Sequence, residues 1–340
     1  MVEERLSEDE AALYDRQIRL WGLEAQKRLR AAKVLLVGLS GLGAEVAKNI
    51  VLSGINSLTL LDHKKVTEED RCNQFLVSRE DVGRNRAEAS QEATQKLNPL
   101  VKITVDTSNI DDKPDSFFQQ FNVICITSSL RNALCRINKL CHEHNIKFFA
   151  TDAFGYFGFM FSDLGSHEFA EEIPKPKPKE TEESENGEPK EKKAKIAMET
   201  VVVKNSSEFV RFESALKFDW STEENQKRLK RTAKVYFIMQ VMLKFLEKHG
   251  RHPSVKSKTS DMEELMKLRT EVLESLSVKQ EVLTDYFVSH CFAELCPVSA
   301  IVGGVLSQEI IKAVSQKDKP HNNFFFFDGI NGTGLVEQIG

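Results

Sequence analysis

The chain has 340 residues, of which 41% are hydrophobic, so it is long enough for one large or two ordinary domains with a buried core. Its 47 basic and 51 acidic side chains leave a formal net charge of -4, so no overall field attracts nucleic acid or an anionic membrane. A charged N-terminal segment and the lack of 18 uninterrupted apolar residues predict a soluble, intracellular protein with no nucleic-acid or membrane partner.

Six cysteines at positions 72, 125, 135, 141, 291 and 296 form no Cys-x-x-Cys pair. Several of them lie inside apolar patterns, where free cysteine behaves as a small hydrophobic residue. The cysteine pattern therefore predicts a reducing compartment and no metal site.

Residues 7–31 carry leucines and isoleucine at roughly helical spacing after Ser7, which predicts one amphipathic N-terminal helix. Strand and helix patterns then alternate. Strands are predicted at 33–38, 57–62, 101–106, 122–127 and 146–151, and helices at about 41–53, 84–97 and 131–145. This alternation predicts an α/β fold with a doubly wound, Rossmann-like, mostly parallel sheet.

The composition changes abruptly at residues 173–199, which hold four of the nine prolines, seven lysines and seven glutamates. Such a segment buries too little apolar surface to offset its ordering entropy. The predicted division places the first part of the α/β domain at 1–165 and a disordered charged linker at 166–204. A small helical accessory domain follows at 205–290, and the chain returns to the α/β domain at 291–340. A helix at 298–314 and a buried strand at 322–329 are expected to rejoin the first sheet.

The glycine turn after the first strand reads GLSGLG, with Gly38, Gly41 and Gly43 around Ser40. Dinucleotide-binding folds carry the middle glycine of GxGxxG where Ser40 stands. The turn alone therefore leaves two interpretations open, nucleotide binding and a purely packing role. Asp62, about 20 residues further, matches the position of a ribose-binding carboxylate. A nicotinamide oxidoreductase is one interpretation, but no convincing hydride-transfer site follows.

Two charged runs allow a structural and a functional interpretation each. Arg16 and Arg19 lie three residues apart in RQIRLWG, and on physical grounds a solvated helix face is favoured over a phosphate clamp. Four lysines fall within residues 190–195, and a solvating run and a nuclear localisation signal explain them about equally well.

Taken together, several segments closely resemble the activating enzymes of ubiquitin-like proteins. They are YDRQIRLWG at 14–22, AEVAKN after the glycine turn, NQFL at 73–76, VGRNRAEAS at 82–90, FFATDAFGYFGFMFSDLG at 148–165 and PHNNFFFFDG at 320–329. The likeness covers almost the whole chain apart from the linker. Within the family it is greatest to the smaller subunits, without a catalytic cysteine, of the heterodimeric enzymes that activate SUMO.

The resemblance implies that the family's nucleotide site is degenerate in this chain. The family's GxGGxG motif reads GLSGLG here, and its ribose-binding carboxylate falls on Lys64. The family's asparagine and arginine fall on Asp70 and Asn73. The lysine that contacts a phosphate falls on Arg86, and the aspartate associated with magnesium falls on Ser129. Lysine removes an acceptor for the ribose hydroxyls, and Asp70 adds negative charge near a triphosphate. Serine supplies no carboxylate for Mg²⁺.

The same resemblance assigns one catalytic role, to Arg16, which would reach in trans to the ATP phosphates held by the partner subunit. No cysteine here matches the family's catalytic-cysteine motif, and residues 205–290 look like a shortened catalytic-cysteine domain. ATP and Mg²⁺ are therefore expected mainly on the partner. The expected partners are the catalytic subunit and SUMO, with the SUMO-conjugating enzyme engaged indirectly. The expected localisation is the nucleus, alone or together with the cytoplasm.

Two related alternatives stay open at this point. A self-sufficient homodimeric adenylyltransferase of the ThiF/MoeB sulfur-carrier type would need the complete nucleotide site. The analogous small subunit of the NEDD8-activating enzyme is expected to be much longer than this chain. The resemblance leaves undecided how much of SUMO this chain touches, which SUMO paralogue is preferred and whether the linker is modified.

Overall fold

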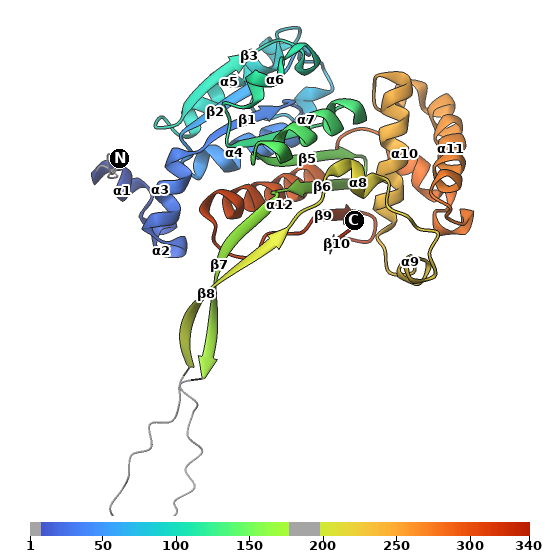
Figure 1. Cartoon of the computed structure of the whole chain (residues 1–340). Coiled ribbons are helices and arrows are strands. Elements are labelled where there is room, and N and C mark those ends of the chain that lie inside the picture. The colour runs from blue at the N-terminus through green and yellow to red at the C-terminus, as the bar shows by residue number, and fades with distance from the viewer. Residues whose placement is uncertain (1–7, 177–197) are drawn as a thin grey trace, which may run out of the picture.

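The computed structural model describes residues 8–176 and 198–340, which form an eight-stranded sheet covered by helices on both faces (Figure 1). The sheet order is β10-β9-β6-β5-β4-β1-β2-β3. Its strands are β1 (Lys33–Val37), β2 (Ser57–Leu61), β3 (Lys102–Asp106), β4 (Val123–Thr127), β5 (Lys147–Phe154), β6 (Phe157–Asp163), β9 (Phe324–Asp328) and β10 (Thr333–Glu337). Strands β1 to β5 pair in parallel, and β6, β9 and β10 extend the sheet antiparallel. The predicted doubly wound, mostly parallel α/β fold is therefore confirmed.

The strands send alternate side chains into two separate hydrophobic clusters. Leu35 of β1 joins one cluster and Leu36 joins the other, as expected for a strand buried on both faces. The run of four phenylalanines in β9 divides in the same way, with Phe324 and Phe326 on one face and Phe325 and Phe327 on the other. The prediction that the C-terminal segment returns to the first sheet is confirmed by the pairing of β9 with β6.

One face of the sheet carries α3 (Leu23–Ala31), α4 (Gly41–Leu52), α5 (Arg86–Leu97) and α12 (Cys296–Ser315). Within the described chain, α12 is the helix whose length and apolar composition would allow it to cross a membrane. It packs instead against α3, α4, β5 and β6. Close packing with α4 depends on Gly303, where a Cβ would lie 2.8 Å from the Cβ of Glu45. This helix is therefore part of the core.

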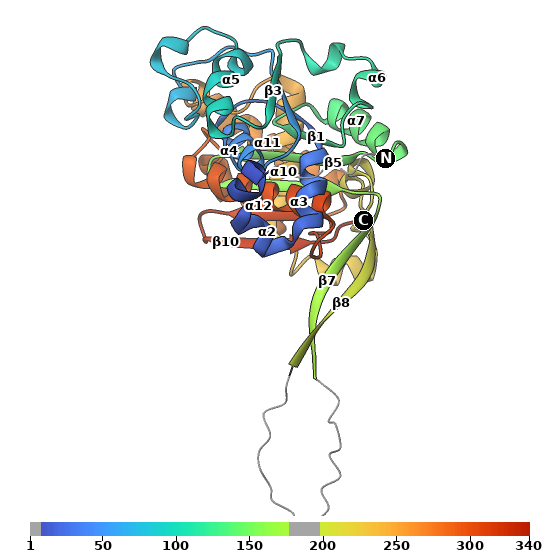
Figure 2. The same ribbon diagram turned by 90° about the vertical axis from the view of Figure 1, so that its left-hand side faces the viewer.

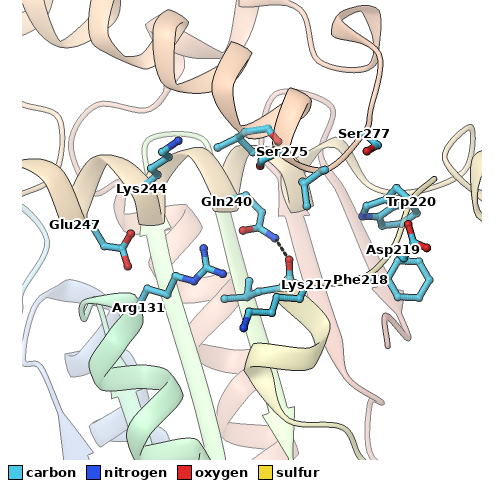
Figure 3. A pocket seen from close by; sticks show the side chains of 13 residues that line it. Arg131, Lys217, Phe218, Asp219, Trp220, Gln240, Lys244, Glu247, Ser275 and Ser277 are labelled. Carbon is cyan, nitrogen blue, oxygen red and sulfur yellow. Dashed lines mark hydrogen bonds between the residues drawn. The ribbon is translucent and has the colours of Figure 1, made fainter.

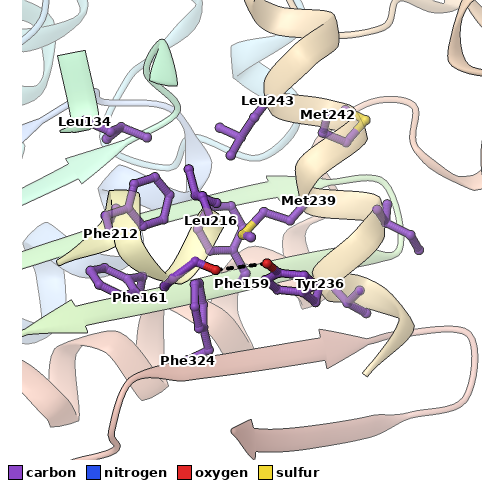
Figure 4. Packing of buried hydrophobic residues seen from close by; sticks show 14 of the residues in the cluster. Leu134, Phe159, Phe161, Phe212, Leu216, Tyr236, Met239, Met242, Leu243 and Phe324 are labelled. Atoms are coloured by element: carbon purple, nitrogen blue, oxygen red, sulfur yellow. Dashed lines mark hydrogen bonds between the residues drawn. The ribbon is translucent and has the colours of Figure 1, made fainter. Parts of the chain in front are cut away.

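The other face carries α6 (Asp115–Phe118), α7 (Arg131–Glu143), α8 (Phe212–Leu216) and α10 (Lys234–His249), with α11 (Lys258–Ser275) packed on α10. The short helix α9 (Glu223–Arg228) buries no side chain. Figure 4 shows α10 lying across the sheet, with Tyr236 beside Phe324 and its hydroxyl bonded to the Ala215 carbonyl oxygen at 2.9 Å. Burying each such aromatic side chain contributes about 2 kcal/mol. The segment predicted as an accessory domain thus shares one hydrophobic cluster with the sheet.

The N-terminal segment differs from the single helix predicted for residues 7–31. It forms α1 (Glu8–Leu13), α2 (Asp15–Trp21) and α3, with breaks at Tyr14 and Gly22 (Figure 2). Gly22 has a φ of 89°, a left-handed backbone conformation that glycine adopts without a Cβ penalty. Helical spacing of the apolar residues continues across this break, so the pattern alone could not reveal it.

The prediction of a disordered linker at 166–204 is wrong at both ends of that range. Strands β7 (Ser166–Pro176) and β8 (Met198–Glu208) pair antiparallel along their whole length and project from the body as a ribbon (Figure 1). Each of the eleven residues of one strand lies opposite a residue of the other, and the average composition of the segment gave no sign of this pairing. The lysine run at 190–196 lies outside the described residues, so the nuclear localisation predicted from it stays a prediction.

Candidate functional site

The candidate site lies where the carboxyl ends of β1, β2 and β4 meet, at the point where the strand order reverses. Two adjoining cavities of about 670 and 190 Å³ occur here. Eight of the nucleotide-site positions singled out from the sequence line one or both: Gly38, Ser40, Asp62, Lys64, Asp70, Asn73, Arg86 and Ser129. Gly41 and Gly43 lie in the first turn of α4. The tertiary structure therefore brings the predicted pseudo-nucleotide site together.

Close packing accounts for each of the three glycines in the turn. Gly38 has a φ of 89°, and a Cβ there would lie 2.2 Å from the Thr127 hydroxyl oxygen. At Gly43 a Cβ would lie 2.1 Å from the Gly38 carbonyl oxygen, and at Gly41 it would lie 2.8 Å from the Asn73 side chain. Real Cβ atoms do not approach so closely, so the motif is required by packing whether or not a phosphate binds.

A carboxylate from a distant part of the chain occupies the N-terminus of α4. Glu294 Oε1 accepts hydrogen bonds from the Leu42 backbone N–H at 2.6 Å and the Ser40 hydroxyl at 3.1 Å. Its Oε2 accepts from the Gly41 N–H at 3.2 Å, and the Ser299 hydroxyl donates to Oε1 at 3.2 Å. Sequence reasoning missed Glu294, because more than 250 residues separate it from the turn and no local motif marks it.

The cation expected to contact a phosphate is paired within the chain. Arg86 binds Asp70 through two contacts, Nη2 to Oδ1 at 2.8 Å and Nε to Oδ2 at 3.1 Å. The Thr67 N–H and hydroxyl donate to the same carboxylate at 2.7 and 2.9 Å. Both charged side chains are largely buried, at 16% and 6% exposure, so this paired geometry is held firmly.

The remaining predicted positions are also used by the fold. Asp62 accepts the Leu39 N–H and the Lys64 N–H, each at 2.8 Å, and so fixes the two turns that follow β1 and β2. The Lys64 side chain is exposed, and Ser129 is half-buried beside the smaller cavity. Across residues 8–176 and 198–340, no group of three or more His, Cys, Asp and Glu side chains has an arrangement suited to a metal ion.

A second pair of residues missed by sequence reasoning lines the larger cavity. His252, from the segment between α10 and α11, places Nε2 2.8 Å from Asp152 Oδ2. Burial opposes protonation of His252, but the Asp152 carboxylate and its hydrogen bond outweigh that cost, with smaller opposing effects of Lys64 and Glu294, so the pKa of His252 lies above its ordinary value.

The raised pKa predicts that this contact stabilises the fold more at lower pH. Its contribution is complete below the unfolded-state pKa of about 6.5 and is lost as the pH rises through the folded-state value. We expect His252→Gln to destabilise the chain by about 1 kcal/mol more near pH 6 than near pH 8.5, because a charged hydrogen bond is the stronger one. Urea unfolding of both proteins at the two pH values tests this, and an equal or reversed difference contradicts it.

Arg16 lies far from these cavities in sequence, on α2. Its side chain is exposed and makes no hydrogen bond or ion pair with any described residue, whereas the neighbouring Arg19 binds Asp15 at 3.0 Å. Leu13 and Leu20 nearby are 58% and 71% exposed, and Leu23 is 45% exposed. An unpaired cation among exposed apolar side chains is typical of a surface that contacts another molecule.

The helix that carries Arg16, α2, is anchored by Tyr14, the residue that precedes the helix. Tyr14 is 2% exposed, and its hydroxyl accepts a hydrogen bond from Asn98 at 2.9 Å. The tyrosine ring packs against Gly54, where a Cβ would lie 2.5 Å from the ring. A tyrosine and an arginine two residues apart in one motif thus have different roles, since Tyr14 fixes the helix whereas Arg16 is exposed and bonds to no part of the chain that the structure describes.

Burial separates the cysteines into two groups. It raises the pKa of four thiols above the ordinary value, those of Cys125, Cys135, Cys141 and Cys291. Cys72 and Cys296 are exposed, and the Cys296 Sγ lies 3.1 Å from the Cys72 carbonyl oxygen. The four protected thiols are held in the protonated form, which is a poor nucleophile.

A further cavity of about 400 Å³ opens among α7, α8, α10 and α11 (Figure 3). Arg131, Gln240 and Glu247 line it, with Trp220 at one end, and the amide of Gln240 donates to the Leu216 carbonyl oxygen at 2.8 Å. None of the site residues predicted from the sequence lines this cavity.

Comparison with known proteins identifies the family. The model of the ThiF family matches residues 14–339. SUMO-activating enzyme subunit 1 from Homo sapiens is 52% identical over 336 residues, which cover 98% of this chain and 96% of that protein. The Xenopus laevis protein of the same name is 52% identical and the Danio rerio one 51%, each over 98% of this chain and over 97% and 96% of their own lengths.

Among solved structures, the crystal structure of E. coli MccB with succinimide has a TM-score of 0.56 at 14% identity, covering 96% of this chain and 72% of that one. This likeness concerns the fold alone. The sequence resemblance to ubiquitin-like-protein activating enzymes is confirmed by the near full-length relatives. The chain belongs to the ThiF family and, within it, groups with the SUMO-activating enzyme subunit 1 proteins.

Proposed function

We propose that this chain is the subunit without a catalytic cysteine in a heterodimeric SUMO-activating enzyme. It pairs with the catalytic subunit, supports ATP-dependent adenylation of the SUMO C-terminus, and leaves thioester formation to a cysteine of that partner. The observation that carries this proposal is 52% identity over 98% of the chain to SUMO-activating enzyme subunit 1. The SUMO-conjugating enzyme is engaged only indirectly, through the product on the partner.

The pseudo-nucleotide site does not fit a bound ATP. The carboxylate of Glu294 lies at the helix N-terminus where a phosphate would accept hydrogen bonds, and a second anion there would be repelled. Arg86 is committed to Asp70, and Lys64 offers no acceptor to the ribose hydroxyls. ATP and Mg²⁺ are therefore held mainly by the partner, and this chain alone supplies no complete site.

Arg16 supplies the direct chemical contribution of this chain. Its guanidinium is exposed and has no partner among residues 8–176 and 198–340, and it lies on a helix anchored by Tyr14, so it is available to another subunit. The exposed Leu13, Leu20 and Leu23 beside it form an apolar surface for the catalytic subunit. A fixed cation placed against the phosphates stabilises the charge that develops as the SUMO carboxylate displaces pyrophosphate from ATP.

ATP:pyrophosphate exchange with mature SUMO tests the proposal. We expect exchange by the mixture of this chain and the catalytic subunit, and at most background exchange by either protein alone, because the composite site needs Arg16. Exchange by this chain alone would support a self-sufficient adenylyltransferase of the sulfur-carrier type instead. Full exchange by the catalytic subunit alone would contradict the proposal that both subunits contribute to the site.

A further inference from the structure

We propose that Glu294 is an internal anion that fills the phosphate-binding end of α4, so that the folded chain carries its own carboxylate in place of a nucleotide phosphate. The inference rests on the proposed function, in which this half of the heterodimer binds no ATP. It goes further by assigning the loss of phosphate binding to one side chain outside every motif of the nucleotide site.

The donors around Glu294 form the set that a helix N-terminus offers to an anion. The first N–H groups of a helix have no partner within it, and its N-terminus carries a partial positive charge. Gly41 and Leu42 direct two of these N–H groups at the carboxylate, and Ser40 and Ser299 add two hydroxyls. Ser40 is the N-cap of α4, yet its hydroxyl caps no backbone N–H. Glu294 therefore caps the helix in its place.

The backbone of Glu294 is held so that its carboxylate stays at this position. The Asn73 side-chain amide donates to the Glu294 carbonyl oxygen at 3.1 Å, and the preceding Ala293 carbonyl accepts the Gly155 N–H at 2.7 Å. Two residues later the 20-residue core helix α12 begins. These three restraints on the backbone give the Glu294 carboxylate a high effective concentration at the N-terminus of α4, so free phosphate in solution cannot compete with it.

The substitution of the motif's middle glycine fits the same arrangement. Ser40 has an extended backbone, with φ of -73°, so no steric rule demands glycine at this position. Its side chain instead gains a hydrogen bond to Glu294 that glycine could not make. The serine that departs from the family's phosphate-binding motif thus binds the anion that replaces the phosphate.

Thermal unfolding of the full-length chain with and without inorganic phosphate tests the proposal. We expect Glu294→Ala to lower Tm by about 5 °C, because two backbone N–H groups lose a charged acceptor. Tens of millimolar phosphate should restore several degrees to this variant by entering the emptied helix end, and should leave the wild-type chain within about 1 °C. Glu69→Ala is the matched control, since Glu69 lines the same cavity but its carboxylate pairs with the surface residue Lys256 and not with the end of α4.

The proposal is overturned if Glu294→Ala keeps the wild-type Tm, or if phosphate raises Tm equally in the wild type, Glu294→Ala and Glu69→Ala. Should Glu294→Ala fail to fold, Glu294→Gln carries the test, because it keeps the shape and one acceptor oxygen. We then expect a smaller fall in Tm than for alanine, and an unchanged Tm rejects the idea. Failure of the proposed function would appear separately, in the exchange assay of the two-subunit mixture.

Discussion

Replacing Arg16 by alanine is expected to slow adenylation by the assembled enzyme tenfold or more. Loss of one donor that stabilises developing charge in the transition state costs about 2 to 4 kcal/mol. The side chain is exposed and unpaired among the described residues, so its removal leaves the fold of this chain unchanged. Initial rates of ATP:pyrophosphate exchange with mature SUMO, measured with the catalytic subunit present, give the effect.

The chain offers a matched control on the same helix. Arg19 is also exposed but is paired with Asp15, and we expect Arg19→Ala to change the exchange rate less than twofold. Arg16→Lys should recover only part of the rate, because lysine keeps the charge but not the fixed fork of guanidinium donors. Equal rates for the wild type and Arg16→Ala at saturating partner would show that Arg16 has no chemical role.

Substituting Gly43 by alanine is expected to destabilise the chain by about 3 kcal/mol, with or without ATP. The new Cβ would meet the Gly38 carbonyl oxygen at 2.1 Å, and that oxygen belongs to backbone at the start of the glycine turn. Neither partner can move without shifting β1 against α4. Urea unfolding of the isolated chain measures the loss, and a glycine kept only for phosphate contact would show none.

Gly304 supplies the control for that experiment. It lies in the middle of α12, and a Cβ there would meet no atom within 4 Å beyond the neighbouring backbone of the helix itself. We expect Gly304→Ala to leave the stability of the isolated chain unchanged or to raise it by about 0.5 to 1 kcal/mol, because alanine favours the helix. A comparable loss in both variants would mean that helix propensity or a general effect, rather than the close contact, sets the cost.

Local patterns predicted most of the fold. The apolar runs at 33–38 and 322–329 became β1 and β9, because strands buried on both faces need little besides continuous hydrophobic residues. The same kind of reasoning failed where backbone conformation or pairing decides. Gly22 interrupts the N-terminal helix through its own φ, and β7 pairs with β8 across a segment whose composition predicted disorder.

For the site, motifs located the residues but not their contacts. Arg86 and Asp70 were both identified, yet their mutual pairing emerges only when a loop and a helix 16 residues apart fold together. Glu294 and His252 carry no local signal, since Glu294 meets the Leu42 N–H 252 residues away and His252 meets Asp152 100 residues away. Short-range periodicity contains no information about such contacts.

The sequence by itself determined the doubly wound sheet, the family resemblance and the set of substituted nucleotide-site positions, because these depend on local hydrophobic period and on residue identity. Only the tertiary structure decided what replaces the missing contacts. Arg86 pairs with Asp70, Glu294 occupies the N-terminus of α4, and Arg16 on its anchored helix pairs with no residue that the structure describes. The reason is that hydrogen-bond and charge partners are chosen by distance in space, and the packing of α4, α12 and the strand ends sets those distances.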